Sequence, residues 1–413
     1  MNFLSIGIGV FLAFTTFLPS LFYTNIAIIA LTYFLRIEYK YFNWIVLALI
    51  VFIISFFLNT FLSHNAEYWK HFLLYLFIVS PILLAIFTNI STDVKILETF
   101  IIAHVYLSVF EFPLQLFQFV SYYGLNFSEL MINSSAGDIA KGTIGNSALL
   151  AYKQILSILL VLMFPALFSR YRTLLLVILV VSFLLIGANH SLILFLLAVV
   201  LAFLFDKPSM KMIFAFISLS VVGAAFMFFV FHSQVQYIVS TLSRFDLESF
   251  PRYKVFLEWF DYSNFNEILQ TFLAGSGPGS LGSRASYILS GEYLWGGTMP
   301  LLGVSMMETF KSVMLPLWNS EITSNLYISG TYYMPFSTYV SIFLEYGIIV
   351  FLLFCYFVFY CVLLLQRNLG FVGAVFGLFV AVMLAVDNFV EYPRFFLPIL
   401  LTVFYISRLE CRK

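Results

Sequence analysis

Long apolar runs separated by short polar breaks make up most of this sequence. A helix needs about 20 mostly apolar residues to cross the hydrocarbon core of a membrane. Runs of roughly this length predict twelve spanning helices, near residues 3–18, 20–35, 42–62, 71–90, 96–120, 147–168, 171–187, 190–205, 211–231, 338–365, 369–386 and 395–407. The first run is predicted to be an uncleaved span, because no basic residue precedes Arg36 and no small-residue cleavage site follows a short apolar core. The predicted fold class is an all-α polytopic membrane protein.

One long segment, residues 232–337, breaks the pattern because it contains five basic and eight acidic residues and a Gly-Ser-rich stretch. Its first part, TLSRFDLESFPRYKVFLEWFDYSNFNEILQTFL, has apolar residues at helical spacing and predicts one or two amphipathic helices. AGSGPGSLGS follows at 274–283 and predicts turns. The chain therefore divides into nine spans in residues 1–231, a large loop in 232–337, and three spans in 338–413.

Composition agrees with a membrane protein. Hydrophobic residues make up 62% of the 413 positions and charged residues 10%, whereas soluble domains typically carry about 25% charged residues. The formal net charge is zero, which gives no indication of a nucleic-acid partner. The sequence has no phosphate-binding Gly-rich loop ending in Lys-Ser/Thr, so ATP-driven pumping is excluded. No metal-ligand spacing or nucleophilic triad is visible, and we predict no cofactor.

Basic residues fix the predicted orientation. Cytoplasmic loops of membrane proteins are enriched in Lys and Arg. With both termini in the cytoplasm, the inner segments hold eleven of the twenty basic residues: Arg36, Lys40, Lys95, Arg170, Arg172, Lys207, Lys211, Arg367, Arg408, Arg412 and Lys413. The large loop is then extracytoplasmic, together with a smaller loop at 121–146.

The two clearest ionisable residues inside predicted spans are Glu111 in VFEFPLQLF and Glu345 in FLEYGIIVF. An ionisable group inside a membrane costs about 3 kcal/mol on insertion scales and therefore suggests a function. Helix–helix packing is the alternative for each, and function is favoured more for Glu345. His190, in a tight outer turn between two spans, could bind phosphate or move a proton, or it could be structural.

Several basic residues fall on the predicted outer face, where they would form an anion-binding mouth. They are Arg244, Arg252, Lys254, Arg284, Lys311 and Arg394. The planar guanidinium of arginine binds phosphate in bidentate fashion, which suits a diphosphate. For any one of them, a solvated surface charge or a snorkelling side chain is the alternative.

The order of these features resembles the O-antigen polymerase and ligase superfamily. GTIGNSALLAYKQIL is similar to the family's Gly-Thr-Phe-Gly-Asn stretch, and GANHSLILFLLAVV to its Ser-Arg-small start of a later span. SRFDLESFPRYKVFLEWF followed by FLAGSGPGS resembles an Arg-x-x-x-Trp helix leading to a Gly-x-Gly turn. FSTYVSIFLEYGIIVFLLF resembles the segment with Leu-x-Glu-x-Gly after the large loop. The resemblance covers roughly residues 135–400.

Two positions depart from the family pattern, and the second of them favours one branch of it. His190 stands where the family has Arg, and Phe336-Ser337 stands where the ligase branch has His. The resemblance therefore implies a polymerase rather than a ligase. It extends to Arg252, to the turn of Gly275 and Gly277, and to Glu345.

The resemblance implies an enzyme that joins oligosaccharide repeat units carried on undecaprenyl diphosphate, at the outer face of the bacterial cytoplasmic membrane. Arg252, Arg244 and Arg394 would bind the diphosphate, with Lys254 and Arg284 beside them. Glu345 or His190 would act as the base. The implied partners are the lipid-linked oligosaccharide, membrane lipid, a chain-length regulator and a flippase.

Two alternatives stay open at this point. A ligase of the same superfamily would transfer finished glycan to another acceptor. A flippase or secondary transporter for lipid-linked sugars would share the composition, but more often shows paired halves and short loops.

Overall fold

The computed structural model describes residues 2–18, 21–30, 35, 68–123, 140–206, 251–262, 272–273, 275–277, 279–281, 310–318 and 336–410, with a few isolated positions between 210 and 225. Within these ranges every regular element is a helix and none is a strand. The all-α class predicted from the sequence is therefore confirmed for this part of the chain.

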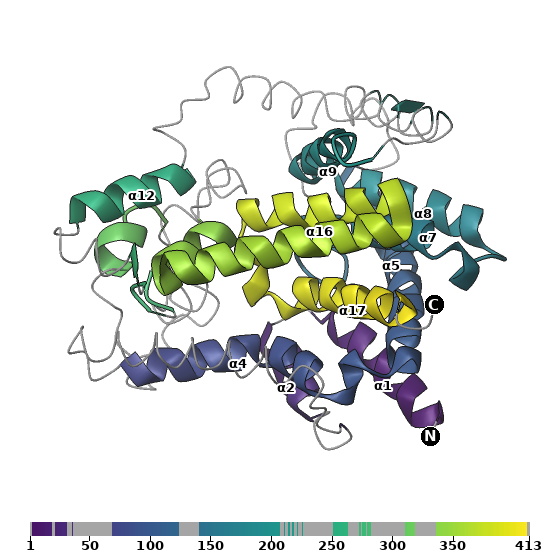
Figure 1. Cartoon of the computed structure of the whole chain (residues 1–413). Coiled ribbons are helices and arrows are strands. Elements are labelled where there is room, and N and C mark those ends of the chain that lie inside the picture. The colour runs from purple at the N-terminus through teal and green to yellow at the C-terminus, as the bar shows by residue number, and fades with distance from the viewer. Residues whose placement is uncertain are drawn as a thin grey trace.

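The described residues form ten α-helices (Figure 1). They are α1 Asn2–Thr15, α2 Leu21–Ala30, α4 Tyr68–Phe87, α5 Val94–Tyr123, α7 Ser147–Met163, α8 Arg172–Ile186, α9 Asn189–Ala202, α12 Pro251–Tyr262, α16 Thr338–Val386 and α17 Pro393–Glu410. Shorter turns are the 3-10 helices η2 Asn89–Ser91, η3 Pro165–Leu167 and η6 Phe389–Glu391, and the π-helical η5 Phe310–Met314. The predicted span at 42–62, nearly all of that at 211–231 and most of the large loop lie outside the described residues.

The helix α16 is a hairpin of two antiparallel arms. Its chain reverses at Gly370, where φ is 61°, a left-handed conformation that glycine adopts at little cost. The Tyr339 hydroxyl donates to the Ala381 carbonyl oxygen at 3.1 Å across the arms. At the open end, the Thr338 amide donates to the Asp387 carbonyl oxygen at 3.2 Å. The arms correspond to the predicted spans 338–365 and 369–386.

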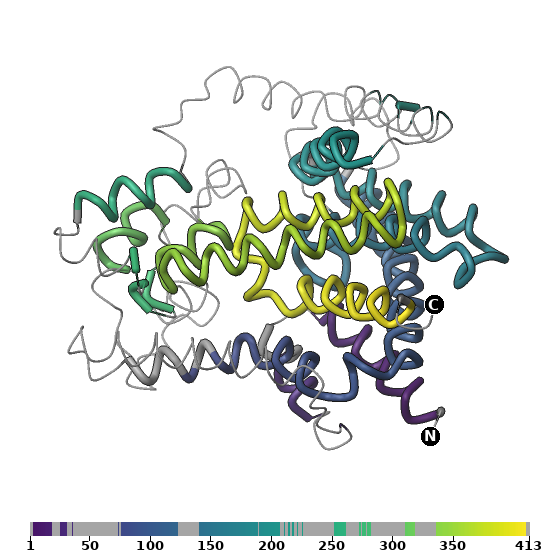
Figure 2. The backbone as a smooth tube through the Cα atoms, in the orientation of Figure 1, coloured from purple at the N-terminus to yellow at the C-terminus, as the bar shows by residue number. Residues whose placement is uncertain are grey.

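The helices α7, α9 and α17 pack against this hairpin. α9 and α17 both contact α16, and α17 also contacts α4 and α5. Figure 2 shows α17 running alongside the hairpin. The helix α1 approaches α5 so closely that a Cβ on Gly9 would lie 2.7 Å from the Ile96 carbonyl oxygen.

α5 has its polar side inside and its apolar side outside. Phe110 is 72% exposed and Phe117 68%, whereas His104, Ser108 and Gln115 have no exposed area. A helix on the surface of a soluble protein has the opposite arrangement. Polar residues that face the protein interior and apolar residues that face outward are typical of a helix in lipid.

Two helices among the described residues are long and apolar enough to cross a membrane. They are Val94–Tyr122 in α5 and Thr338–Val386, the α16 hairpin. Five further apolar helices, including α7, α8 and most of α9, have 10 to 17 residues. Length and composition therefore give weak support to membrane association, and the number of spans and their orientation stay predictions.

Candidate functional site

A short segment between α16 and α17, residues 386–394, gathers several of the predicted site residues. We call it the junction. The helix α12 reaches it through Arg252, which is only 7% exposed. The Arg252 Nε donates to the carbonyl oxygens of Phe336 at 3.0 Å and Val386 at 3.1 Å, and its Nη2 also donates to Val386. Arg252 thus ties α12 to both ends of the hairpin.

The position of the Arg252 guanidinium is also electrostatically favourable. The Val386 carbonyl belongs to the last turn of α16, where the helix dipole is negative. A cation near such an end is stabilising, by about 0.3–1 kcal/mol at exposed sites.

Two further cations meet the C-terminal end of α1. Arg394 Nη1 donates to the Leu18 carbonyl oxygen at 2.9 Å, and Lys153 Nζ donates to the Thr16 carbonyl oxygen. Lys153 Nζ also lies 3.9 Å from the centroid of the Phe17 ring, within the range of a cation–π interaction. Lys153 interacts electrostatically with both Arg394 and Glu111. Arg394 of the junction and Lys153 of α7 therefore lie together at the C-terminal end of α1.

His190 approaches the junction through Tyr152. The two rings are 5.6 Å apart, edge to face. Tyr152 in turn packs against Phe389 at 5.2 Å and Phe395 at 5.8 Å. The structure thus brings Arg252, Arg394 and His190 to one region, although they lie far apart in the sequence.

Glu345 is placed differently, inside a turn rather than at an opening. Its side chain has no exposed area. Its Oε2 accepts from the Gly279 amide at 2.9 Å and its Oε1 from the Leu281 amide at 3.1 Å. We call residues 275–277 and 279–281 the glycine turn. A base role would require contact with an acceptor hydroxyl, and this carboxylate is directed at backbone amides instead.

The backbone around Glu345 also binds the glycine turn. Gly347 has a φ of 78°, which interrupts the first arm of α16. The Ser276 amide donates to the Leu344 carbonyl oxygen at 2.7 Å, and the Gly277 amide to the Glu345 carbonyl oxygen at 2.9 Å. A Cβ on Gly275 would lie 2.2 Å from the Glu345 carbonyl oxygen, so only glycine fits there.

Glu111 holds the smaller outer loop in a similar way. Its Oε2 accepts from the Thr143 amide at 2.9 Å, and its Oε1 accepts from the Thr143 hydroxyl. Two turns further along α5, Gln118 Oε1 accepts from the amides of Lys141 at 3.0 Å and Gly142 at 2.9 Å. Both carboxylates that the sequence places in spans therefore bind glycine-containing turns.

The remaining predicted residues are spread around this region. Lys254 lies partly exposed on α12, and Lys311 is exposed in η5. Arg244 and Arg284 lie outside the described residues. The roles given to all of these residues, and to Arg252, Arg394, His190 and Glu345, stay predictions.

The structure adds polar residues that the sequence reading did not single out. Along α5, His104, Ser108 and Gln115 lie on the same face as Glu111, at intervals of three to four residues. Their partners include Ser157, whose Oγ lies 2.7 Å from that of Ser108. This helical spacing of polar residues inside an apolar run was visible in the sequence.

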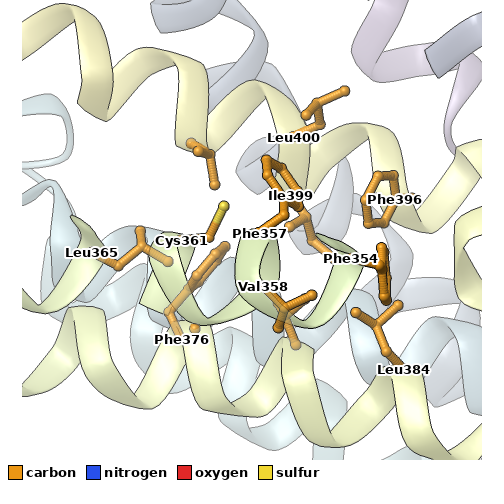
Figure 3. A pocket seen from close by; sticks show the side chains of 13 residues that line it. Phe354, Phe357, Val358, Cys361, Leu365, Phe376, Leu384, Phe396, Ile399 and Leu400 are labelled. Carbon is orange, nitrogen blue, oxygen red and sulfur yellow. The ribbon is translucent and has the colours of Figure 1, made fainter. Parts of the chain in front are cut away.

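A small apolar cavity lies between the α16 hairpin and α17 (Figure 3). Its volume is ≈ 40 Å³, and its lining includes Phe354, Cys361, Phe376 and Ile399. These side chains offer no strong hydrogen-bonding group that could orient a substrate. The cavity is therefore a packing defect of the helices rather than a candidate catalytic site.

Among the described residues, no group of three or more His, Cys, Asp or Glu side chains could hold a metal ion. Comparisons with protein-family models, with curated proteins and with solved structures find no match to this chain.

Proposed function

We propose that this chain is a polytopic enzyme of the bacterial cytoplasmic membrane that joins oligosaccharide repeat units carried on undecaprenyl diphosphate. The reaction breaks the bond between the first sugar of the donor glycan and its diphosphate. The same sugar carbon bonds to a hydroxyl of the acceptor unit, which gives up a proton. Undecaprenyl diphosphate leaves with the electron pair of the broken bond.

One observation carries this proposal: two arginines from distant parts of the chain lie at the two ends of the junction. Arg252 and Arg394 are 142 residues apart in sequence, yet Arg252 donates to the first residue of the junction and Arg394 is its last. A leaving diphosphate needs positive charge and hydrogen-bond donors at the place where its negative charge develops. In the proposed orientation, the junction faces the outside of the cell.

The two arginines have distinct parts in this proposal. Arg252 joins α12 to the open end of the α16 hairpin, and its guanidinium carries five N–H donors. Arg394 lies in the first turn of α17 and interacts electrostatically with Lys153. His190, close to Tyr152, is the candidate that would accept the hydroxyl proton.

The proposal is tested in cells by replacing each arginine and analysing the surface polysaccharide. We expect Arg252→Ala and Arg394→Ala to abolish long polymer and leave single repeat units attached to their final acceptor. Arg252→Lys keeps the charge but loses the planar fork, so we expect partial activity. Unchanged chain length and amount in both alanine variants would overturn the proposal.

A control variant tests whether the removal of any positively charged side chain reduces polymer, or only the removal of those at the junction. Lys95, on α5, is about half exposed and pairs with Glu98 at 3.6 Å, away from the junction. Lys95→Ala should leave polymer unchanged. Comparison of membrane levels of all variants with the native protein excludes a folding defect as the cause. A ligase differs in its outcome, because its loss leaves no repeat units attached at all.

The buried polar face of α5 favours a second function, proton-coupled movement of a lipid-linked sugar. His104 and Lys153 are fully buried and Glu111 nearly so, and ionisable groups within spans mark proton relays in transporters. Liposomes that contain the purified protein and a lipid-linked oligosaccharide distinguish the two. A transporter moves the glycan between leaflets when a proton gradient is applied, without lengthening it.

A further inference from the structure

We propose that the Glu345 carboxylate is a positioning group that holds Arg252 at the junction, acting through the glycine turn and α12. This inference rests on the proposed function for its effect on turnover. Its structural part, the placement of α12 by Glu345, does not depend on which reaction the protein catalyses.

Four backbone amides of the glycine turn donate hydrogen bonds to α16. Two amides of the turn donate to the Glu345 carboxylate, and two others donate to the carbonyls of Leu344 and Glu345. The break in α16 at Gly347 makes these carbonyls available, because the helix cannot supply their usual partners across it. Hydrogen bonds to an ionised carboxylate are stronger than neutral ones. The turn is therefore fixed to the first arm of α16.

Hydrophobic packing connects the glycine turn to α12. Leu281 of the turn, Leu344 of α16, and Val255 and Trp259 of α12 belong to one hydrophobic cluster and are all buried. Val255 and Trp259 lie three and seven residues after Arg252, on the same face of the helix. A displaced turn would therefore move the face of α12 that carries Arg252.

The helix α12 also contacts α16 directly, beside Glu345. The rings of Phe256 and Phe343 are 5.9 Å apart, and Phe343 lies two residues before Glu345. Phe272, which precedes the glycine turn, is also 5.9 Å from Phe343. The helix α12, the glycine turn and the Glu345 carboxylate thus form one packed unit, and Arg252 belongs to it through α12.

The structural part is tested by measuring the distance between α12 and α16 in the purified full chain in lipid nanodiscs. Spin labels are placed at two exposed positions, on α12 with Glu258→Cys and on α16 with Tyr356→Cys. The native cysteines Cys355, Cys361 and Cys411 are first replaced by alanine. Glu345→Gln keeps the side-chain size but turns an NH₂ group toward a backbone N–H.

We expect Glu345→Gln to shift or broaden the distance between the labels. Glu111→Gln is the matched control, since it loosens the other carboxylate-bound turn, and it should leave this distance as in the native protein. An unchanged distance in Glu345→Gln would overturn the inference, as would an equal change in Glu111→Gln.

The functional part is tested by a double-mutant comparison of polymerisation rates. A positioning group that acts through Arg252 should lower the rate in the native background and add no further loss once Arg252 is replaced by alanine. Additive losses would overturn the link to Arg252, because they would show that Glu345 acts independently. If the distance shifts but no variant, nor the native protein, polymerises glycan, the proposed reaction fails and the placement of α12 by Glu345 stands.

Discussion

Gly275 and Gly145 have nearly the same backbone conformation but different surroundings. Their φ angles are 78° and 74°. A Cβ on Gly145 would meet nothing within 4 Å, whereas one on Gly275 would lie 2.2 Å from the Glu345 carbonyl oxygen. The pair therefore separates the cost of backbone strain from the cost of a collision.

We predict that Gly145→Ala lowers stability by about 1–2 kcal/mol, the cost of a left-handed conformation for a residue with a side chain. Gly275→Ala should cost about 1–3 kcal/mol more, because the neighbouring backbone must shift. Thermal unfolding of both variants in the same detergent measures the difference. Equal melting temperatures would contradict the close contact between the glycine turn and Glu345.

Thr143 offers a second test at the scale of one side chain. Thr143→Val keeps the amide that donates to Glu111 but removes the donating hydroxyl. We expect a loss of about 1 kcal/mol, typical of one hydrogen bond in a partly exposed site. Thr143→Ser retains the hydroxyl and should behave as the native protein. If thermal unfolding shows the valine variant to be as stable as the serine variant, Glu111 does not bind the loop through this hydroxyl.

Single residues also show where sequence reasoning stops. Glu111 and Glu345 stand out because a carboxylate inside a span is costly, so the sequence was sufficient to select them. Their partners are 32 and up to 66 residues away, and no local pattern encodes such contacts. For the same reason the contact between Lys153 and Thr16, 137 residues apart, could not be predicted.

Helix α1 allows a test at the scale of an element, because its two glycines face different neighbours. A Cβ on Gly7 would meet nothing within 4 Å, and one on Gly9 would lie 2.7 Å from the Ile96 carbonyl oxygen of α5. We predict that Gly7→Ala raises stability by up to about 1 kcal/mol, through helix propensity. Gly9→Ala should lower it by about 1–3 kcal/mol. Thermal unfolding in detergent checks both, and a stabilising Gly9→Ala would contradict the α1–α5 packing.

Helices and their ends were the best predicted features of this chain. The predicted spans at 171–187 and 190–205 correspond to α8 and α9, and the reversal after 365 corresponds to Gly370. Long apolar periodic runs and turn-forming glycines are strong local patterns. The interruption of the first α16 arm at Gly347 was not predicted, because a single glycine within an apolar run resembles an ordinary helical position.

At the scale of the whole molecule, orientation is the first prediction to test. Basic residues place both termini and the reversal at Gly370 in the cytoplasm. A fluorescent protein fused after residue 413 should therefore fluoresce, and alkaline phosphatase at the same position should be inactive. The opposite result would invert the topology and place the junction on the side that holds no lipid-linked glycan acceptor.

The family resemblance and the structure contribute to different parts of the account. Motifs such as FPRYKVFLEWF and FLEYGIIVF suggested which residues matter, and the structure brings Arg252, Arg394 and His190 to the junction.

The central claim is that this chain lengthens a lipid-linked glycan at the junction. The most direct measurement is made on the purified protein in liposomes supplied with an undecaprenyl-diphosphate-linked repeat unit and no nucleotide. The account predicts glycans of two or more units together with released undecaprenyl diphosphate, and loss of both products in Arg252→Ala and Arg394→Ala but not in Lys95→Ala. Lengthened glycan at the native rate from both arginine variants, or no lengthening by the native protein, would contradict it.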